Sequence, residues 1–257
     1  MKLCLDAGHG GSDPGAVHGD LIEKDLTLRL AKLVESDLYM RFSDIKVIQT
    51  RTNDSYVSLA ERARLANQAG ADYFVSLHFN AGGGTGFESY SYIYVPEKTM
   101  HMNRILHETL AKMLPFRDRG QKEANFQVLR DTKMPAILIE CCFLDHPDDA
   151  AWLRVPGNLE YLATAISRSC AISLGLVASG SGGIVPLFFE LRRGMKGNDV
   201  RIIQVMLKQF GFGYSQVDGI FGELTEKAVK DFQKKYKLNP TGVFDRRTLE
   251  AVCKNTP

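Results

Sequence analysis

The chain has 257 residues, of which 44% are hydrophobic and 24% are charged, and its formal net charge is +2. This length favours one large domain or two unequal ones, and the apolar content is ample for a packed core. No window approaches the roughly 18 apolar residues of a transmembrane helix, and aromatic residues do not alternate with basic ones as in a nucleic-acid-binding surface. We therefore expect neither membrane insertion nor nucleic-acid binding.

Charge and cysteine usage add two expectations. Residues 186–257 carry 13 Lys and Arg against 8 Asp and Glu, so the C-terminal part is the basic one. The five cysteines form no C-x-x-C pair, which favours free thiols and synthesis in a reducing compartment. Because a candidate site begins within ten residues of Met1, we expect synthesis in the cytoplasm without a signal peptide.

Strands and helices alternate along the first two thirds of the chain. Hydrophobic periodicity predicts strands at 2–6, 45–50, 73–78, 87–95 and 135–140, and helices at 23–40, 58–69, 98–114 and 159–174. This alternation over about 175 residues predicts an α/β fold, with a twisted, mostly parallel or mixed sheet and helices on both faces.

A composition change marks the end of this region. The Ser- and Gly-rich segment 178–183 reads as part of a flexible linker, for which we take residues 176–187. We therefore expect a catalytic domain at 1–175 and a second domain at 188–257. Helical periodicity at 199–210, 224–236 and 246–253 predicts that the second domain is a small all-α bundle of three helices.

Four residues with metal-binding or acid/base chemistry fall at the ends of predicted elements. His9, His78 and Glu140 each come at or just after the end of a strand, and Glu23 lies in the first turn of a helix. In open α/β sheets, the carboxyl edge of the strands is where functional sites lie. We expect these four side chains to meet there.

The residue types suggest zinc chemistry. Zinc hydrolases commonly use three protein ligands of the His and Glu kind and leave a fourth position for water. His9, Glu23 and His78 would then bind one Zn²⁺, and Glu140 would act as the general base. A single histidine or glutamate at the end of a strand or helix is more often a structural or surface residue than a functional one, so the argument depends on all four together.

A thiol hydrolase is the rival chemistry. Adjacent Cys141 and Cys142 follow the candidate base, and His78 could activate one of them. Nothing nearby indicates a lowered thiol pKa, however, and cysteines at the end of an apolar strand usually behave as inert core residues. The metal site is therefore the preferred interpretation.

Short motifs raise the case for zinc. Residues 2–174 resemble the zinc-dependent N-acetylmuramoyl-L-alanine amidases, through these segments in the same order: Asp6–Gly11, Asp13–Ala16, Glu23-Lys24, Thr50-Arg51 with Asp54, Leu59, Arg62, Ala66-Asn67, Ser76–Ala81, Val128–Arg130, Met134–Ala136, and Glu140 with Phe143-Leu144. The resemblance implies cleavage of the amide between N-acetylmuramic acid and L-alanine in peptidoglycan. It places His9, Glu23 and His78 on the zinc positions and Glu140 on the catalytic glutamate.

Other residues near these motifs are candidates for substrate binding. Asn80, Arg51 and His146 could contact the substrate, although Asn80 could equally form a turn and His146 a solvated loop. Arg62, on a helix, is better read as an internal salt-bridge partner. Cys142 stands where such amidases often have glycine, and it would be strained if that position needed a positive φ.

The C-terminal part has a resemblance of its own. Gly194–Gly197, Val217–Gly222 and Thr248-Leu249, with Gln204 and Gln233 between them, are similar to the three-helix peptidoglycan-binding domain found beside many wall hydrolases. The turn at Asp218–Gly222 is expected to be structural. The basic charge would favour an anionic wall polymer as a further partner.

Together these features predict a monomeric wall-lytic enzyme with a zinc amidase domain tethered to peptidoglycan. Free thiols and the expected lack of a signal fit an enzyme that accumulates in the cytoplasm and reaches the wall after release, as a phage endolysin does. Three alternatives stay open: a bacterial sporulation or autolytic amidase, a zinc peptidase that cuts the stem peptide, and a wall-binding protein without catalysis.

Overall fold

The computed structural model describes residues 1–176, 190–213 and 216–255. It divides into two compact units, Met1–Ala150 with Ala163–Val185 and Ala151–Leu162 with Pro186–Pro257. The expected linker, residues 176–187, lies outside the described residues except for its first residue. The expected domain limits at residues 175 and 188 therefore stay predictions.

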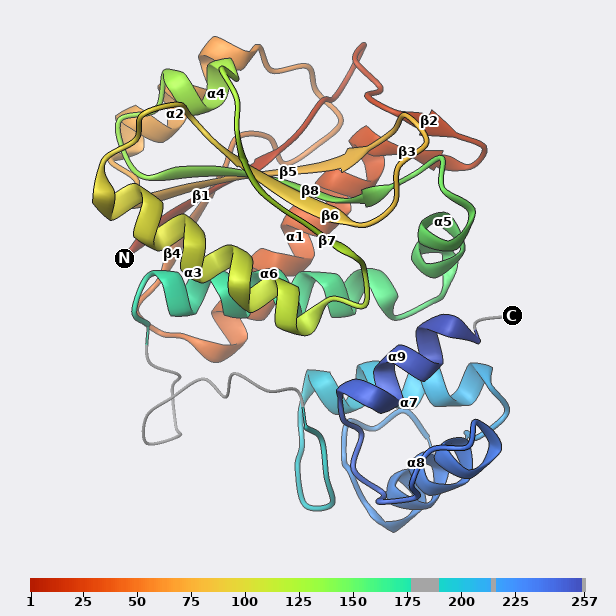
Figure 1. The fold of residues 1–257 in the computed structure, drawn as a ribbon. Coiled ribbons are helices and arrows are strands. Elements are labelled where there is room, and N and C mark those ends of the chain that lie inside the picture. The colour runs from red at the N-terminus through yellow and green to blue at the C-terminus, as the bar shows by residue number, and fades with distance from the viewer. Residues whose placement is uncertain (177–189, 214–215, 256–257) are drawn as a thin grey trace. The chain divides into compact units, whose positions relative to one another are not determined.

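A six-stranded sheet forms the centre of the first unit (Figure 1). Its strands are β1 (Lys2–Ala7), β4 (Lys46–Gln49), β5 (Tyr73–Asn80), β6 (Phe87–Ser91), β7 (Asp118–Glu123) and β8 (Ala136–Phe143). In the order β4-β1-β5-β8-β6-β7, the first four strands are parallel, whereas β6 runs antiparallel to β8 and parallel to β7. The predicted mostly parallel or mixed sheet is confirmed.

Helices cover both faces of this sheet, as predicted (Figure 1). One face carries α1 (Glu23–Arg41), α3 (Glu97–Met113) and α6 (Asn158–Ser173), and the other carries α2 (Leu59–Ala69) and the short α4 (Gln127–Arg130). The central strands β1, β5 and β8 are buried along almost their whole length, because helices cover both faces of the sheet, whereas each helix presents one apolar stripe to it. Under α2 and α4 the core includes Cys4, Ala66, Phe74, Val128, Leu129 and Leu138.

Five elements in the first two thirds of the chain were not predicted, and one strand is shorter than expected. The edge strand β7, the hairpin of β2 (Val17–His18) and β3 (Leu21–Ile22), helix α4 and helix α5 (Pro147–Arg154) have no clear hydrophobic periodicity. Strand β6 ends at Ser91 rather than at Val95. Ser58, expected to be helical, is the N-cap of α2 and accepts a hydrogen bond from the Glu61 amide, as such caps do.

The second unit contains the three predicted helices, α7 (Asn198–Gln209), α8 (Glu223–Lys235) and α9 (Arg246–Lys254). The loops between them are held in the same way twice. Gln204 and Gln233 each donate to a threonine at the start of the next helix, Thr225 and Thr248, at 3.0 and 2.9 Å. Each glutamine also accepts a hydrogen bond from the backbone amide of a glycine in the intervening loop, Gly219 or Gly242. Buried amide side chains therefore organise both loops.

Along the described part of the chain, no helix combines the length and apolarity needed to cross a membrane.

Candidate metal centre

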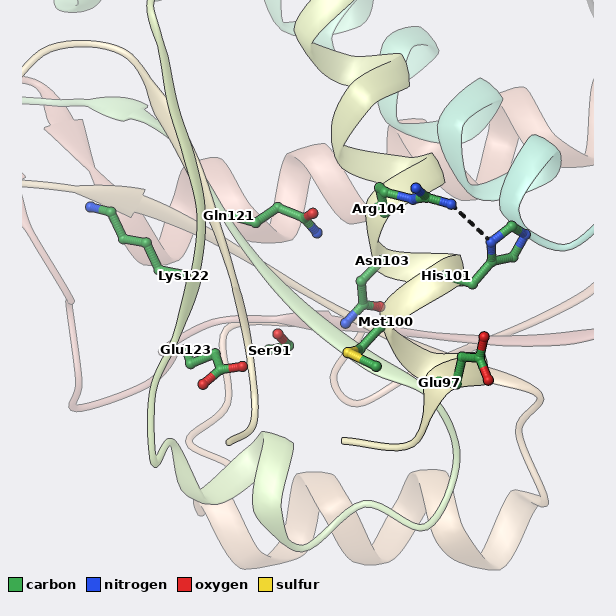
Figure 2. A pocket seen from close by; sticks show the side chains of 9 residues that line it. All are labelled: Ser91, Glu97, Met100, His101, Asn103, Arg104, Gln121, Lys122 and Glu123. Carbon is green, nitrogen blue, oxygen red and sulfur yellow. Dashed lines mark hydrogen bonds between the residues drawn. The ribbon is translucent and has the colours of Figure 1, made fainter. Parts of the chain in front are cut away.

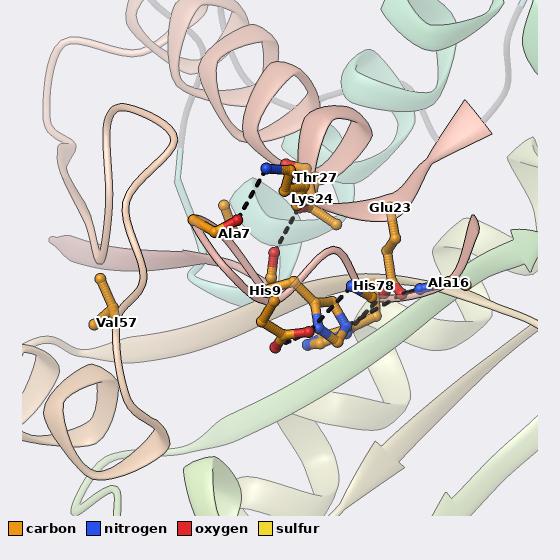
Figure 3. A network of polar contacts seen from close by, with 12 residues as sticks. Ala7, His9, Ala16, Glu23, Lys24, Thr27, Val57 and His78 are labelled. Carbon is orange, nitrogen blue, oxygen red and sulfur yellow. Dashed lines mark hydrogen bonds and ion pairs between the residues drawn. The ribbon is translucent and has the colours of Figure 1, made fainter. Parts of the chain in front are cut away.

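His9, Glu23 and His78 come together at the carboxyl edge of the parallel strands. Each offers a ligand atom, and these atoms all lie within 4.8 Å of one another. Glu23 stands between the two imidazoles: its Oε2 lies 3.1 Å from His9 Nε2, and its Oε1 lies 3.0 Å from His78 Nδ1 (Figure 3). The sequence therefore predicted correctly that these three side chains meet.

The Glu23 carboxylate is oriented by the backbone. Its Oε1 accepts a hydrogen bond from the Phe79 amide at 2.9 Å, and its Oε2 accepts one from the Ala16 amide at 2.8 Å. Burial by itself would raise the pKa of Glu23, but the hydrogen bonds from His78 and His9 hold that pKa well below its ordinary value. Glu23 is thus a fixed anion near neutral pH, which suits a metal ligand.

His9 is held in an unusual backbone conformation. Its φ of 61° lies in the left-handed region, which is uncommon for a residue other than glycine and is typical of functional sites. Its Nδ1 lies 2.8 Å from Asp13 Oδ2, so a carboxylate fixes the ring while Nε2 faces Glu23. Burial lowers the pKa of His9, but Glu23 and Asp13 together raise it to about 9. Carboxylates in this position commonly orient histidine ligands of metals.

Two glycines leave room for the ligand side chains. A Cβ atom on Gly15 would lie 2.5 Å from Glu23 Oε2 and 2.6 Å from His9 Cδ2, and one on Gly8 would lie 2.3 Å from the His78 ring. Both positions therefore require a residue without a side chain. This explains in physical terms why the loop after β1 is rich in glycine.

A buried ion pair supports the end of β1 below the site. Arg62 Nη1 donates to Asp6 Oδ1 at 2.8 Å, and the same carboxylate accepts hydroxyl hydrogen bonds from Thr50 and Ser76. Burial would raise the pKa of Asp6, but Arg62 and the two hydroxyls lower it. Arg62 also donates to the carbonyl of His9 at 2.7 Å. The prediction that Arg62 is an internal salt-bridge partner is confirmed.

Arg51 lies in the same buried layer. Its guanidinium donates to the carbonyls of Ala7 at 2.9 Å, Gly8 at 2.9 Å and Lys24 at 2.7 Å, and its side chain is nearly inaccessible to solvent. Figure 3 shows Ala7 and Lys24 within this network. Arg51 thus supports the loop that carries His9, a role that sequence reasoning missed, and it does not reach the site where the three ligands meet.

The donor set fits zinc. Two imidazole nitrogens and one carboxylate are the ligands of many catalytic zinc sites, and donors about 2.1 Å from a tetrahedral ion lie about 3.4 Å apart. Here the ligand atoms of the three residues all lie within 4.8 Å of one another, so modest side-chain adjustments would bring them around one ion.

Glu140 lines the same cavity as the three ligands. The cavity has a volume of about 360 Å³, and its walls combine the polar cluster with apolar residues, namely His9, Ala16, Glu23, Leu59, His78, Phe79, Asn80, Ala81, Phe126, Gln127, Val128, Leu138 and Glu140. Glu140 Oε2 is buried, and among the described residues it has no hydrogen-bond partner. Burial, with smaller effects from Glu23 and Glu88, raises the pKa of Glu140 to about 7. A carboxylate with this pKa can both take up and release a proton near neutral pH.

The other candidate substrate residues are placed differently. Asn80 lines the cavity, and its amide donates to Glu88 Oε1 at 3.0 Å. His146 is not among the residues that line it; its Nδ1 is buried, 3.6 Å from Asp149 Oδ1. Of the three candidates, the structure brings only Asn80 into the cavity with the four proposed zinc and base residues.

The four cysteines whose side chains the structure describes carry no sign of reactivity. Cys4, Cys141, Cys142 and Cys170 are buried free thiols. Burial raises the pKa of Cys141 and Cys142 well above the ordinary value, so neither supplies a thiolate. Cys142 is not among the described residues with positive φ, which removes the strain that its replacement of glycine suggested. The geometry thus disfavours a thiol hydrolase.

Comparison with known families covers both parts of the chain. Residues 3–171 match the N-acetylmuramoyl-L-alanine amidase family, and residues 196–252 match a family of peptidoglycan-binding domains. The crystal structure of an N-acetylmuramoyl-L-alanine amidase from Clostridium difficile 630 superposes with a TM-score of 0.65 at 36% identity, covering 70% of this chain and 98% of that one.

Individual relatives come from bacteria and from a phage. The chain is 44% identical over 176 residues to the amidase CwlM of Bacillus licheniformis, covering 68% of this chain and 70% of the relative. It is 41% identical to a sporulation-specific amidase of Bacillus subtilis, covering 72% of each, and 42% identical to the endolysin of Bacillus phage SPP1, covering 71% and 69%. The chain therefore belongs to the N-acetylmuramoyl-L-alanine amidase family and carries a C-terminal peptidoglycan-binding domain.

Proposed function

We propose that His9, Glu23 and His78 hold one Zn²⁺ and that Glu140 is the general base for hydrolysis of the bond between N-acetylmuramic acid and L-alanine. One observation carries this proposal: the three ligand atoms and the unpartnered Glu140 Oε2 belong to residues that line one cavity. When bound, zinc would supply Lewis acidity, which lowers the pKa of water and stabilises negative charge on the carbonyl oxygen.

The protein side chains account for the proton movements. Glu140 Oε2 would take a proton from the attacking water and later deliver it to the leaving nitrogen of L-alanine. Asp13 would hold the His9 ring in position through the 2.8 Å contact with Nδ1. The apolar wall of Leu59, Phe126 and Val128 would limit the water around the scissile amide.

Product analysis tests the reaction. Purified walls would be digested with the full chain, with and without chelator, and with zinc added back. An amidase releases peptides with a new N-terminal alanine and leaves the glycan strands intact, whereas a peptidase exposes other amino termini. Peptide release that is unaffected by chelation would refute the zinc site, and wall sedimentation without any release would support a binding protein instead.

The C-terminal domain would keep the enzyme on its insoluble substrate. Tethering raises the effective concentration of wall bonds around a catalytic domain that binds each bond weakly. The excess of basic residues in 186–257 would add affinity for anionic wall polymers, and that contribution should weaken with added salt.

For the biological role, we propose a phage endolysin that lyses the host cell. The 42% identity to the endolysin of phage SPP1 supports it, and the 41% identity to a sporulation-specific amidase supports a bacterial role in sporulation as the second candidate. Expression in Bacillus cells with and without a pore-forming phage protein separates the two. Lysis that requires the pore supports the endolysin, whereas failure of mother-cell lysis after deletion of the gene in a spore former supports the sporulation role.

A further inference from the structure

A second carboxylate lies beside the proposed base. Glu88 in β6 is the direct register partner of Glu140 in β8. Paired residues of neighbouring strands project their side chains from the same face of the sheet, and neighbouring strands lie about 4.8 Å apart. Glu88 is therefore the next side chain along the sheet from Glu140, on the side away from His78.

Four side chains satisfy the Glu88 carboxylate. Oε1 accepts hydrogen bonds from Asn80 Nδ2 at 3.0 Å and from the Tyr90 hydroxyl at 2.7 Å. Oε2 accepts one from Arg119 Nε at 2.7 Å and a short one from Lys122 Nζ. Burial would raise the pKa of Glu88, but Lys122, Tyr90 and Arg119 lower it to about 2. Glu88 is thus an anion at any pH at which the enzyme works.

Two cations share this single anion. The side chains of Arg119 and Lys122 are 29% and 37% exposed, whereas that of Glu88 is only 3% exposed. Figure 2 shows that Lys122 leaves β7 on the side away from α3, opposite to Gln121. This is the face that carries Tyr90, its register partner, and the proposed base. Two partly exposed positive charges therefore face the single charge of Glu88, next to Glu140 on the sheet, although neither cation is among the residues that line the cavity.

Aromatic rings hold the two cations in place. The Arg119 guanidinium lies 4.8 Å from the centre of the Phe143 ring, and Lys122 Nζ lies 5.7 Å from that of Tyr90. Tyr90 in turn contacts Phe126, which lines the cavity, at 5.1 Å between ring centres. Such packing restricts the long side chains, so less conformational entropy would be lost when they bind a ligand.

We propose that Arg119 and Lys122 form a carboxylate-binding subsite for the second residue of the stem peptide. The inference rests on the proposed function, because it assumes that the scissile amide lies at Glu140. Lys122 Nζ is hydrogen-bonded to Glu88. Glu88 lies one strand from Glu140, which is about 5 Å along the sheet. Two residues of extended peptide span about 7 Å, so the second residue can reach these cations.

A pair of soluble substrates tests this subsite. Both are muramyl peptides with L-alanine first, and they differ only in whether the second residue carries a free carboxylate or a carboxamide. The full chain loaded with zinc should cleave the carboxylate form with about tenfold higher kcat/KM, because a hydrogen-bonded ion pair is replaced by a neutral contact. Lys122→Met and Arg119→Gln should remove most of this preference, mainly through KM for the carboxylate form.

Matched variants separate binding from folding. Lys112→Met changes an exposed lysine of α3 and should keep the preference. Lys122→Arg keeps the charge and should keep it too, and the Tm of each variant shows whether it is folded. Equal cleavage of both substrates by the wild-type chain would overturn the subsite while the amidase function stands. Cleavage of neither would overturn the proposed function itself. A variant that loses Tm but keeps the preference would show that the two cations only stabilise Glu88.

Discussion

His78 and Glu140 are direct register partners in the parallel pair of β5 and β8. Their side chains therefore leave the same face of the sheet on adjacent strands, about 4.8 Å apart at the backbone. This relationship explains how a base and a metal ligand stay aligned although 62 positions separate them in the chain (140 − 78). Strand pairing, rather than a local motif, sets the spacing of the proposed site.

Glu140→Gln is expected to abolish catalysis while leaving zinc binding intact. The amide has nearly the same shape but cannot accept a proton from water, and loss of a general base costs about 10²- to 10⁴-fold in rate. The measurement is kcat on a soluble muramyl peptide, together with the zinc content of the purified variant. A variant that retains activity, or that loses its zinc, would contradict the role of Glu140 as base.

Asp13→Asn is expected to weaken zinc binding without removing a ligand. Asp13 Oδ2 contacts His9 Nδ1 at 2.8 Å, and loss of such a carboxylate partner typically lowers metal affinity about 10- to 100-fold. Competition with a chelator of known affinity gives the value. Asp131→Asn changes an exposed aspartate and should leave the affinity unchanged. Equal affinities for wild type and Asp13→Asn would show that Asp13 does not support the site.

The elements of the fold that the sequence predicted are those with a buried face. Strands β1, β5 and β8 are short, nearly continuous buried runs, and helices α1 and α3 carry apolar residues at helical spacing, so all five were predicted to within a few residues of their ends. Strand β7, with the sequence DRGQKE, was missed because it is an edge strand with little buried surface. Its backbone pairing with β6 is a tertiary property that hydrophobic periodicity does not encode.

The same limit applies to the site. His9, Glu23, His78 and Glu140 could be found because their residue types are informative and they mark element ends. For Arg51 and Arg62, the residue type alone does not separate a substrate-binding role from a structural one. Both donate hydrogen bonds to backbone carbonyls of the loop that carries His9. Glu88 was missed because its importance depends on Lys122 and Arg119, from a strand that was not predicted.

Gly15→Ala is expected to damage the metal centre more than its backbone strain explains. Gly15 has a φ of +65°, and the new methyl group would lie 2.5 Å from Glu23 Oε2. Gly70 is the matched control, since its φ of +59° carries the same strain, while a Cβ there meets nothing closer than 4.0 Å. Backbone strain should cost each variant about 1 kcal/mol of stability, and the overlap with Glu23 should cost Gly15→Ala more than that and make it alone lose zinc. Equal zinc contents in the two variants would disprove the steric requirement.

Glu88→Gln is expected to change how stability depends on pH. The folded-state pKa of Glu88 lies near 2, below the ordinary 4.5. A depressed carboxyl pKa contributes stability that is fully present above about pH 4.5 and is lost as the pH falls toward 2. At pH 6 the variant should be less stable than wild type by about 2 kcal/mol, the cost of weakening charged hydrogen bonds at a buried group.

Urea unfolding of both chains at pH 6, 4 and 3 measures this difference. The gap in the free energy of unfolding should narrow as the pH falls below about 4.5, because the unfolded wild-type chain takes up a proton at Glu88 that the folded chain, with its lowered pKa, does not yet bind. Glu61→Gln, which breaks the exposed ion pair with Arg64, should show little difference from wild type at any of these pH values. The difference in the free energy of unfolding between wild type and Glu88→Gln could instead stay constant from pH 6 to pH 3. That result would mean that the shape of the Glu88 side chain, and not its charge, holds Arg119, Lys122 and Asn80 in place.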